Sequence, residues 1–180
     1  MSTHTQVATE RLILRERTKE LLADVLKRPE RDQLFFFGYS DPADLQREHD
    51  MFEKGLSNWK MEFRWWDILE QGNKIVVGAA GFHSWYTDHS RAELGYALFE
   101  PYRGKGYMIE ALRKIVDLGF TEMGLNRIEA FVGPTNEKSV RIMAQLGFTR
   151  EGLLREHYHK KNRVEDSAAY SLLKREYFKL

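Results

Sequence analysis

A glycine-rich basic turn joins a strand pattern to a helix pattern in the middle of the chain. Residues 91–100 alternate as in a strand, and residues 104–123 carry apolar side chains at the spacing of one helix face. The turn reads Tyr-Arg-Gly-Lys-Gly-Tyr-Met over residues 102–108. A strand that leads directly into an amphipathic helix forms a βα unit, which places the chain among folds that pack helices on a sheet.

Patterns on both sides of this unit predict a single domain, residues 1–180, without repeats or linkers. The Gln71-Gly72-Asn73 turn favours antiparallel pairing of its flanking strands. The run Phe35-Phe36-Phe37-Gly38 is either a buried connection or the wall of a binding pocket. Other strands are predicted at residues 9–16, 61–69, 74–86, 127–132, 148–157 and 165–173. Other helices are predicted at residues 18–28, 41–59 and 136–146.

Composition excludes several classes of function. The 28 lysines and arginines nearly balance 27 acidic residues, so the net charge of +1 offers no general attraction to nucleic acids or anionic membranes. Without cysteine, the chain has no disulfides, thiolate zinc sites or thiol nucleophiles. No segment approaches the roughly 20 apolar residues that span a bilayer, and the polar start lacks a signal-peptide layout, so we expect a cytoplasmic protein. The sequence does not decide whether the protein is a monomer or a homodimer.

The basic turn has the features of an anion site. Glycine lets the backbone approach a ligand closely, and the first helical turn offers unpaired N–H groups at its positive dipole end. Arg103 and Lys105 add positive charge. A diphosphate would fit, and an ordinary solvated turn is the alternative. The spacing matches neither a Walker loop nor a dinucleotide fingerprint, which makes ATP and NAD poor candidates.

Several motifs in this order resemble the GNAT acetyltransferases. Arg103 and Gly106 match that family's Gln/Arg-x-x-Gly-x-Gly/Ala signature, and Met108 stands where glycine or alanine is usual. Similar motifs are Thr-Glu-Arg-Leu-Ile-Leu-Arg at 9–15, Gly95-Tyr96, Asn-Glu-Lys-Ser at 136–139, Leu-Gly-Phe at 146–148 and Glu151-Gly152. The chain is most similar to the branch that acetylates N-terminal alanines of ribosomal proteins, which also has members that act on other amines.

The resemblance implies a fold and a cofactor site. The fold is α/β (α+β), with a mixed, mostly antiparallel sheet of six to seven strands and about four helices, splayed at the acetyl-CoA site. Acetyl-CoA is the expected co-substrate, without a metal. Leu98 and Phe99 would pair their backbone with the pantetheine arm and polarise the thioester carbonyl. The Met108 side chain must point away from the phosphates. The implied cofactor residues are Leu98, Phe99, Arg103, Gly104, Lys105, Gly106, Tyr107, Met108 and Asn136.

Acetyl transfer to an amine also needs a base and a proton for the departing thiolate. The resemblance assigns the base to Glu93, for which a solvated or salt-bridged role is the alternative. It assigns pantetheine binding to Asn136 and the thiolate proton to Ser139, although both residue types also serve as helix caps. Rival groups for the base are Glu151, His83, His157 and His159, and Tyr107 is a weaker candidate for the proton donor.

The acceptor amine is less constrained. Aromatic residues near the central strands, such as Trp59, Trp65, Trp66, Trp85 and Tyr86, fit a core or a pocket, and residues 83–86 should lie near Glu93. Residues 157–161 hold two histidines without a third metal ligand and fit an exposed hairpin turn.

Since no thiol can hold an acyl group, direct attack in a ternary complex is expected. The acceptor is a protein N-terminal amine, or a small amine (polyamine, aminoglycoside or amino-acid analogue) if the pocket is acidic. A non-catalytic acetyl-CoA-binding module is a third possibility.

Overall fold

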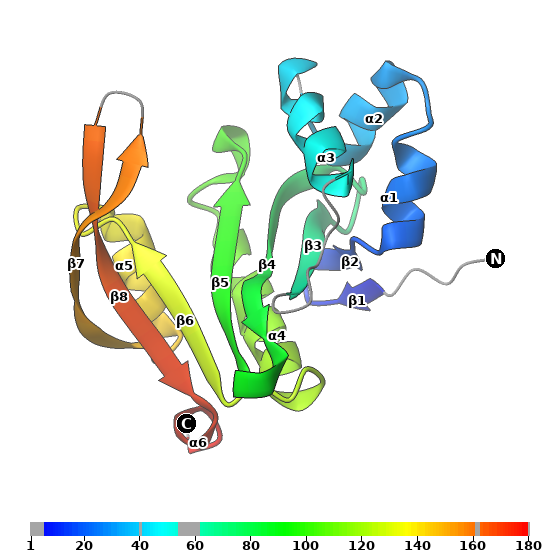
Figure 1. Cartoon of the computed structure of the whole chain (residues 1–180). Coiled ribbons are helices and arrows are strands. Elements are labelled where there is room, and N and C mark those ends of the chain that lie inside the picture. Colours follow the sequence, from blue (N-terminus) through cyan, green and yellow to red (C-terminus); the bar gives the residue numbers. More distant parts are fainter. Residues whose placement is uncertain (1–5, 40, 54–61, 161–162, 180) are drawn as a thin grey trace.

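A single mixed sheet forms the centre of the molecule (Figure 1). The structure is a computed structural model that describes residues 6–39, 41–53, 62–160 and 163–179. Its eight strands pair in the order β1-β2-β3-β4-β5-β6-β8-β7, and only β5 and β6 run parallel. The strands are β1 (Gln6–Ala8), β2 (Leu12–Glu16), β3 (Glu62–Glu70), β4 (Val76–Tyr86), β5 (Arg91–Leu98), β6 (Arg127–Val132), β7 (Thr149–Lys160) and β8 (Arg163–Leu173).

Helices lie on both faces of the sheet, so the predicted fold class is confirmed. They are α1 (Lys19–Val25), α2 (Glu30–Phe37), α3 (Ala43–Glu53), α4 (Tyr107–Thr121), α5 (Glu137–Gln145) and α6 (Lys174–Tyr177). Short 3-10 turns occupy Thr87–His89 and Glu100–Tyr102. None of the helices in the described ranges combines the length and the apolar character needed to cross a bilayer.

The counts of six to seven strands and about four helices are too low. The additional elements are β1, α2 and α6, of which β1 and α6 are too short to show a periodic pattern. The Phe35-Phe36-Phe37 run is the last turn of α2, which ends at Gly38 in the left-handed conformation. The helix predicted at 41–59 begins at Ala43, and its end beyond residue 53 lies outside the described residues.

Strands β5 and β6 separate soon after they begin. They pair only through Arg91–Arg127, Ala92–Ile128 and Glu93–Glu129, whereas β5 stays paired with β4 as far as Leu98. The Phe99 N–H donates to the Val77 carbonyl, so by the alternation of an antiparallel ladder the backbone polar groups of Tyr96 and Leu98 face the other way. The predicted splay of the sheet is therefore present, and it leaves one edge of β5 open.

The two faces of the sheet carry different cores. Helices α4 and α5 cover one face, where the larger core includes Phe82, Leu94 and Ile115. Helices α1, α2 and α3 gather over the other face and enclose a smaller core around Phe37 and Leu22 (Figure 1). Strand β5 thus has helices on both sides at the point where β6 leaves it.

Candidate active site

The basic turn adopts the backbone geometry of an anion cradle. Gly104 and Gly106 have φ of 78° and 79°, in the left-handed region that favours glycine. Gly106 is the N-cap of α4, and no side chain caps this helix. The N–H groups of the first turn of α4 therefore remain available to a ligand.

Contacts from the start of the chain hold this turn in place. Arg11 donates through Nη1 to the Lys105 carbonyl at 3.0 Å and through Nε to Glu110 at 2.7 Å. The Thr9 hydroxyl donates to the same carboxylate at 2.6 Å. The sequence reasoning missed these roles, since Thr9 and Arg11 stood out only within the opening motif and their partner lies about one hundred residues away.

A cavity of about 680 Å³ opens between this turn, α5 and the free edge of β5. Besides the predicted residues, the cations Lys138 and Arg141 line it, together with Tyr96 and Ala97. The predicted site residues along its wall are Leu98, Arg103, Gly104, Gly106, Tyr107, Met108, Asn136 and Ser139. The structure thus brings together residues from three separate segments of the sequence.

Met108 and Tyr107 turn their side chains away from the glycine turn. The Met108 side chain is buried in the larger core, at 6% exposure, so the unusual signature residue does not block the turn. The Tyr107 hydroxyl donates to Glu70, which does not line the cavity. What these residues offer a ligand is their backbone N–H groups at the start of α4.

Two predicted cofactor residues lie elsewhere. The Phe99 N–H is already bonded to Val77 at 2.9 Å, and Phe99 lines a different cavity, on the opposite face of the sheet. Lys105 does not line the cavity, and its Nζ lies 5.2 Å from the centre of the Tyr102 ring. Among the described residues, the backbone groups left unpaired at the splay are therefore those of Tyr96 and the N–H of Leu98, whereas the Leu98 carbonyl accepts from Arg103 Nε at 3.0 Å.

Asn136 and Ser139 face the cavity at the start of α5. The Asn136 side chain caps the helix by accepting the Ser139 N–H at 3.2 Å, and its amide NH₂ has no partner among the described residues. The nearby Tyr96 hydroxyl is buried and lacks a hydrogen-bond partner within the described ranges. Burial raises the pKa of Tyr96, and the neighbouring Ser139 opposes that shift. Tyr96 was singled out only as part of a motif, because burial of its hydroxyl could not be read from the sequence.

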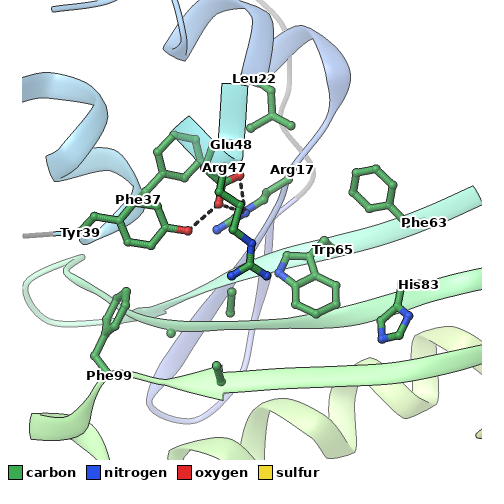
Figure 2. A pocket seen from close by; sticks show the side chains of 13 residues that line it. Arg17, Leu22, Phe37, Tyr39, Arg47, Glu48, Phe63, Trp65, His83 and Phe99 are labelled. Atoms are coloured by element: carbon green, nitrogen blue, oxygen red, sulfur yellow. Dashed lines mark hydrogen bonds and ion pairs between the residues drawn. The ribbon is translucent and has the colours of Figure 1, made fainter. Parts of the chain in front are cut away.

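A second cavity of about 470 Å³ lies on the face covered by α1, α2 and α3 (Figure 2). Aromatic side chains form much of its wall. Phe37 lines this cavity and is also buried in the smaller core, so the phenylalanine run has both a buried and a cavity-lining part. Trp65 also lines it, whereas Trp66 is fully buried in the larger core. The side chains labelled in Figure 2 include Phe37, Tyr39, Phe63, Trp65, His83 and Phe99, together with the charged residues Arg17, Arg47 and Glu48.

Buried ion pairs organise the upper wall of this second cavity. Arg17 donates to Glu48 at 3.2 Å and to Asp67 at 2.7 Å, and Tyr39 also donates to Glu48. Burial alone would lower the pKa of Arg17, but Asp67 and Glu48 outweigh it and raise that pKa. Asp67 is fully buried and also accepts from Arg15 at 2.8 Å. Glu48, which lines the cavity, and Asp67, which lies behind its wall, are thus already paired.

Glu93 lies beside His83 on neighbouring strands of the same face, with 3.6 Å between Oε1 and Nε2. Burial and then the charge of Glu129 raise the pKa of Glu93 to about 7. Glu129 is held by Arg91 at 2.9 Å and by Arg127 at 2.7 Å. Burial lowers the pKa of His83, which keeps its ring neutral at physiological pH.

Of the rival bases, His83 lies beside Glu93, whereas Glu151, His157 and His159 occupy other surroundings. Hydrogen bonds from Arg127 and Ser171 lower the pKa of Glu151 to about 2. His157 packs against Phe131 at 4.9 Å on β7, at the far edge of the sheet. Within the described ranges, no three His, Asp or Glu side chains are grouped to bind a metal.

The two cavities meet at β5. Ala97 lines both of them, just beyond the point where β6 departs. A cofactor on the α4–α5 face and a second substrate on the α1–α3 face would therefore approach one another across a single strand.

Comparison with known proteins agrees with this architecture. The family described as acetyltransferase (GNAT) domain matches residues 11–149. The uncharacterized N-acetyltransferase p20 of Bacillus licheniformis is 37% identical, over 94% of this chain and 96% of that protein. YdaF of Bacillus subtilis (strain 168), provisionally named a ribosomal N-acetyltransferase, is 30% identical over 80% and 78%.

Solved structures share the fold. A GNAT-family acetyltransferase of Bacillus anthracis superposes with a TM-score of 0.68 at 26% identity, covering 95% of this chain and 99% of that one. Spermidine N-acetyltransferase of Vibrio cholerae, solved with CoA and spermine, superposes with a TM-score of 0.69 at 20% identity, covering 94% and 96%. The chain belongs to the GNAT family and is an acetyl-CoA-dependent N-acetyltransferase.

Proposed function

We propose that this enzyme acetylates an α-amino group, such as the N-terminus of a protein, by direct attack within a ternary complex. The observation that carries the proposal is that Ala97 borders both cavities at the open edge of β5. Acetyl-CoA would occupy the cavity on the α4–α5 face, and the amine would enter from the α1–α3 face. Without a cysteine in the chain, no thiol is present to hold the acetyl group between two half-reactions.

The residues of the first cavity fit coenzyme A. The unpaired N–H groups at the start of α4, with Arg103, Lys138 and Arg141 nearby, suit a diphosphate. The free amide NH₂ of Asn136 and the open backbone edge of β5 suit the amide groups of the pantetheine arm. Bound there, acetyl-CoA supplies the acetyl group as an activated thioester.

Glu93 is the proposed base. A general base works best with a pKa near the working pH, and the pKa of Glu93 is raised to about 7. An α-amino group has a pKa of about 8, so a base of this strength can accept its proton, directly or through water. Glu93 also shares a face of the sheet with His83, which lines the amine cavity.

Ser139 and Tyr96 are the proposed source of the proton for the departing thiolate. Both line the cofactor cavity, and the Tyr96 hydroxyl has no other partner among the described residues. The raised pKa of Tyr96 keeps its hydroxyl protonated at neutral pH, which a proton donor requires. Ser139 was already a candidate from the sequence, and the structure adds Tyr96 as a second candidate.

The charges of the second cavity favour an α-amine over a polyamine. Glu48, the carboxylate that lines it, is already paired with Arg17 and Tyr39, and Arg47 adds a positive charge. Among the described residues that line the cavity, a polycation would find no unpaired carboxylate to balance this charge. The provisional name of YdaF, a ribosomal N-acetyltransferase, points to the same class of acceptor.

A thiol-release assay tests the proposal. Peptides with N-terminal alanine and spermidine would be compared as acceptors, with acetyl-CoA saturating. We expect CoA release with the peptides and at least tenfold lower kcat/KM with spermidine, since one unfavourable charge contact of about 1.4 kcal/mol has that effect. Preferential acetylation of spermidine would contradict the proposed acceptor class.

A further inference from the structure

Arg47 carries an unbalanced positive charge at the acceptor cavity. It lies on the exposed side of α3, lines the cavity, and has no acidic partner at ion-pair distance among the described residues. Figure 2 shows its guanidinium directed from α3 toward the indole of Trp65. A guanidinium that points into a substrate cavity without a partner is prepared for an anion from outside the chain.

The neighbouring charges do not neutralise Arg47. Both oxygens of Glu48 accept from Arg17 at 3.2 Å, and Tyr39 donates to one of them as well. Asp67 is occupied by Arg15 and Arg17 behind the wall. The arginines and carboxylates of this wall are thus matched with one another, apart from Arg47.

The opposite end of the cavity is suited to the amine. His83 lines it with a neutral ring and contacts Glu93, the proposed base. Trp65 packs 6.3 Å from His83, ring centre to ring centre, and Arg47 approaches the same indole from α3. An acceptor lying along Trp65 would place its amine at the Glu93 end and a second group at Arg47.

We propose that Arg47 binds a carboxylate of the acceptor, so that the enzyme acetylates α-amines that carry a carboxylate nearby. The planar fork of a guanidinium matches a carboxylate with two parallel hydrogen bonds. This inference rests on the proposed acetylation of α-amines and deepens it by naming the second group that is recognised. The carboxylate could be the C-terminus of a small amino-acid-like molecule or an acidic side chain close to a protein N-terminus.

Two matched pairs of acceptors test this and distinguish the sources. Ala-Ala and Ala-Ala-amide differ in the terminal carboxylate, and Ala-Asp-Ala-amide and Ala-Asn-Ala-amide differ in the side-chain carboxylate. The members of each pair have similar α-amines, so differences in KM report on the carboxylate. CoA release would be measured with wild type, Arg47→Gln, Arg47→Lys and the control Arg113→Gln, an exposed cation on α4 that lines neither cavity.

For wild type we expect a KM roughly tenfold or more lower for the carboxylate member of at least one pair, as a charge-assisted hydrogen bond provides. Arg47→Gln should bring that ratio close to one, Arg47→Lys should restore part of it, and Arg113→Gln should keep it. Equal KM values in both pairs for wild type, or a ratio that survives Arg47→Gln, would overturn the inference. If no amine released CoA although acetyl-CoA bound, the proposed function would fail and this inference with it.

Discussion

The two cavities beside β5 are built in different ways. The one on the α4–α5 face depends on backbone geometry, namely a left-handed glycine turn, a helix start and an unpaired strand edge. The one on the α1–α3 face depends on side chains, with paired charges and aromatic rings drawn from many elements. Under the proposed function, the backbone features would hold acetyl-CoA, whereas the side chains of the second cavity would select the acceptor.

The largest expected effect comes from Glu93, on the α1–α3 face of the sheet. Glu93→Gln should lower kcat by roughly 10²–10⁴-fold, the usual contribution of a general base. The rise of wild-type kcat through a pKa of about 7 should disappear from the pH profile. The CoA released at saturating acetyl-CoA would be followed from about pH 5 to about pH 9.

Stability provides an independent check on the same residue. The folded protein retains the proton of Glu93 between the ordinary pKa of 4.5 and about 7, so this group's contribution to stability is lost as pH rises through that range. Glu93→Gln should therefore unfold at a higher temperature than wild type above neutral pH.

Glu151→Gln is the matched comparison for the effect on kcat. A large loss of kcat in Glu151→Gln with none in Glu93→Gln would reassign the base.

The next largest effect concerns the glycine turn of the cavity on the α4–α5 face. Gly106→Val places a β-branched residue at a φ of 79° and brings its Cβ to 3.3 Å from the Arg11 guanidinium. Such strain costs about 1–3 kcal/mol, so the turn of the free variant should relax out of the left-handed conformation. Binding of acetyl-CoA would then have to restore the turn, and the affinity should fall roughly tenfold to a hundredfold. Titration calorimetry with acetyl-CoA measures it, with Gly72→Val, in an open turn, as the control. Equal affinity in the two variants would remove the glycine turn from the account.

The smallest effect concerns the tuning of Glu93. Glu129→Gln removes the like charge that helps to raise the pKa of Glu93, so the acid limb of the kcat profile should move to lower pH. Because burial is the larger cause, the shift should be partial. A profile that stays in place, or one that moves to higher pH, would show that Glu129 does not act on Glu93 in this way.

The sequence predicted the local backbone features well and the side chains assembled by the tertiary fold poorly. The strand at residues 127–132 was predicted as β6 is observed, and the turn at 102–108 was placed correctly because both signals are local. The α2 helix was missed because its phenylalanines lack helical spacing and no side chain caps its start. Arg17 and Arg47 could not be assigned to a site, since only the tertiary fold brings the connection between β2 and α1, which holds Arg17, and α3, which holds Arg47, beside the same cavity.

The most direct test of two substrates meeting across β5 is Ala97→Phe. By strand alternation the side chain of residue 97 lies on the same face as Glu93, so a phenyl ring there would fill the acceptor side of the junction. We expect acetyl-CoA affinity to stay within about threefold of wild type while kcat/KM for the amine falls by roughly 10²-fold, as misplaced reactants require. Acetyl transfer at the wild-type rate by Ala97→Phe would contradict the account.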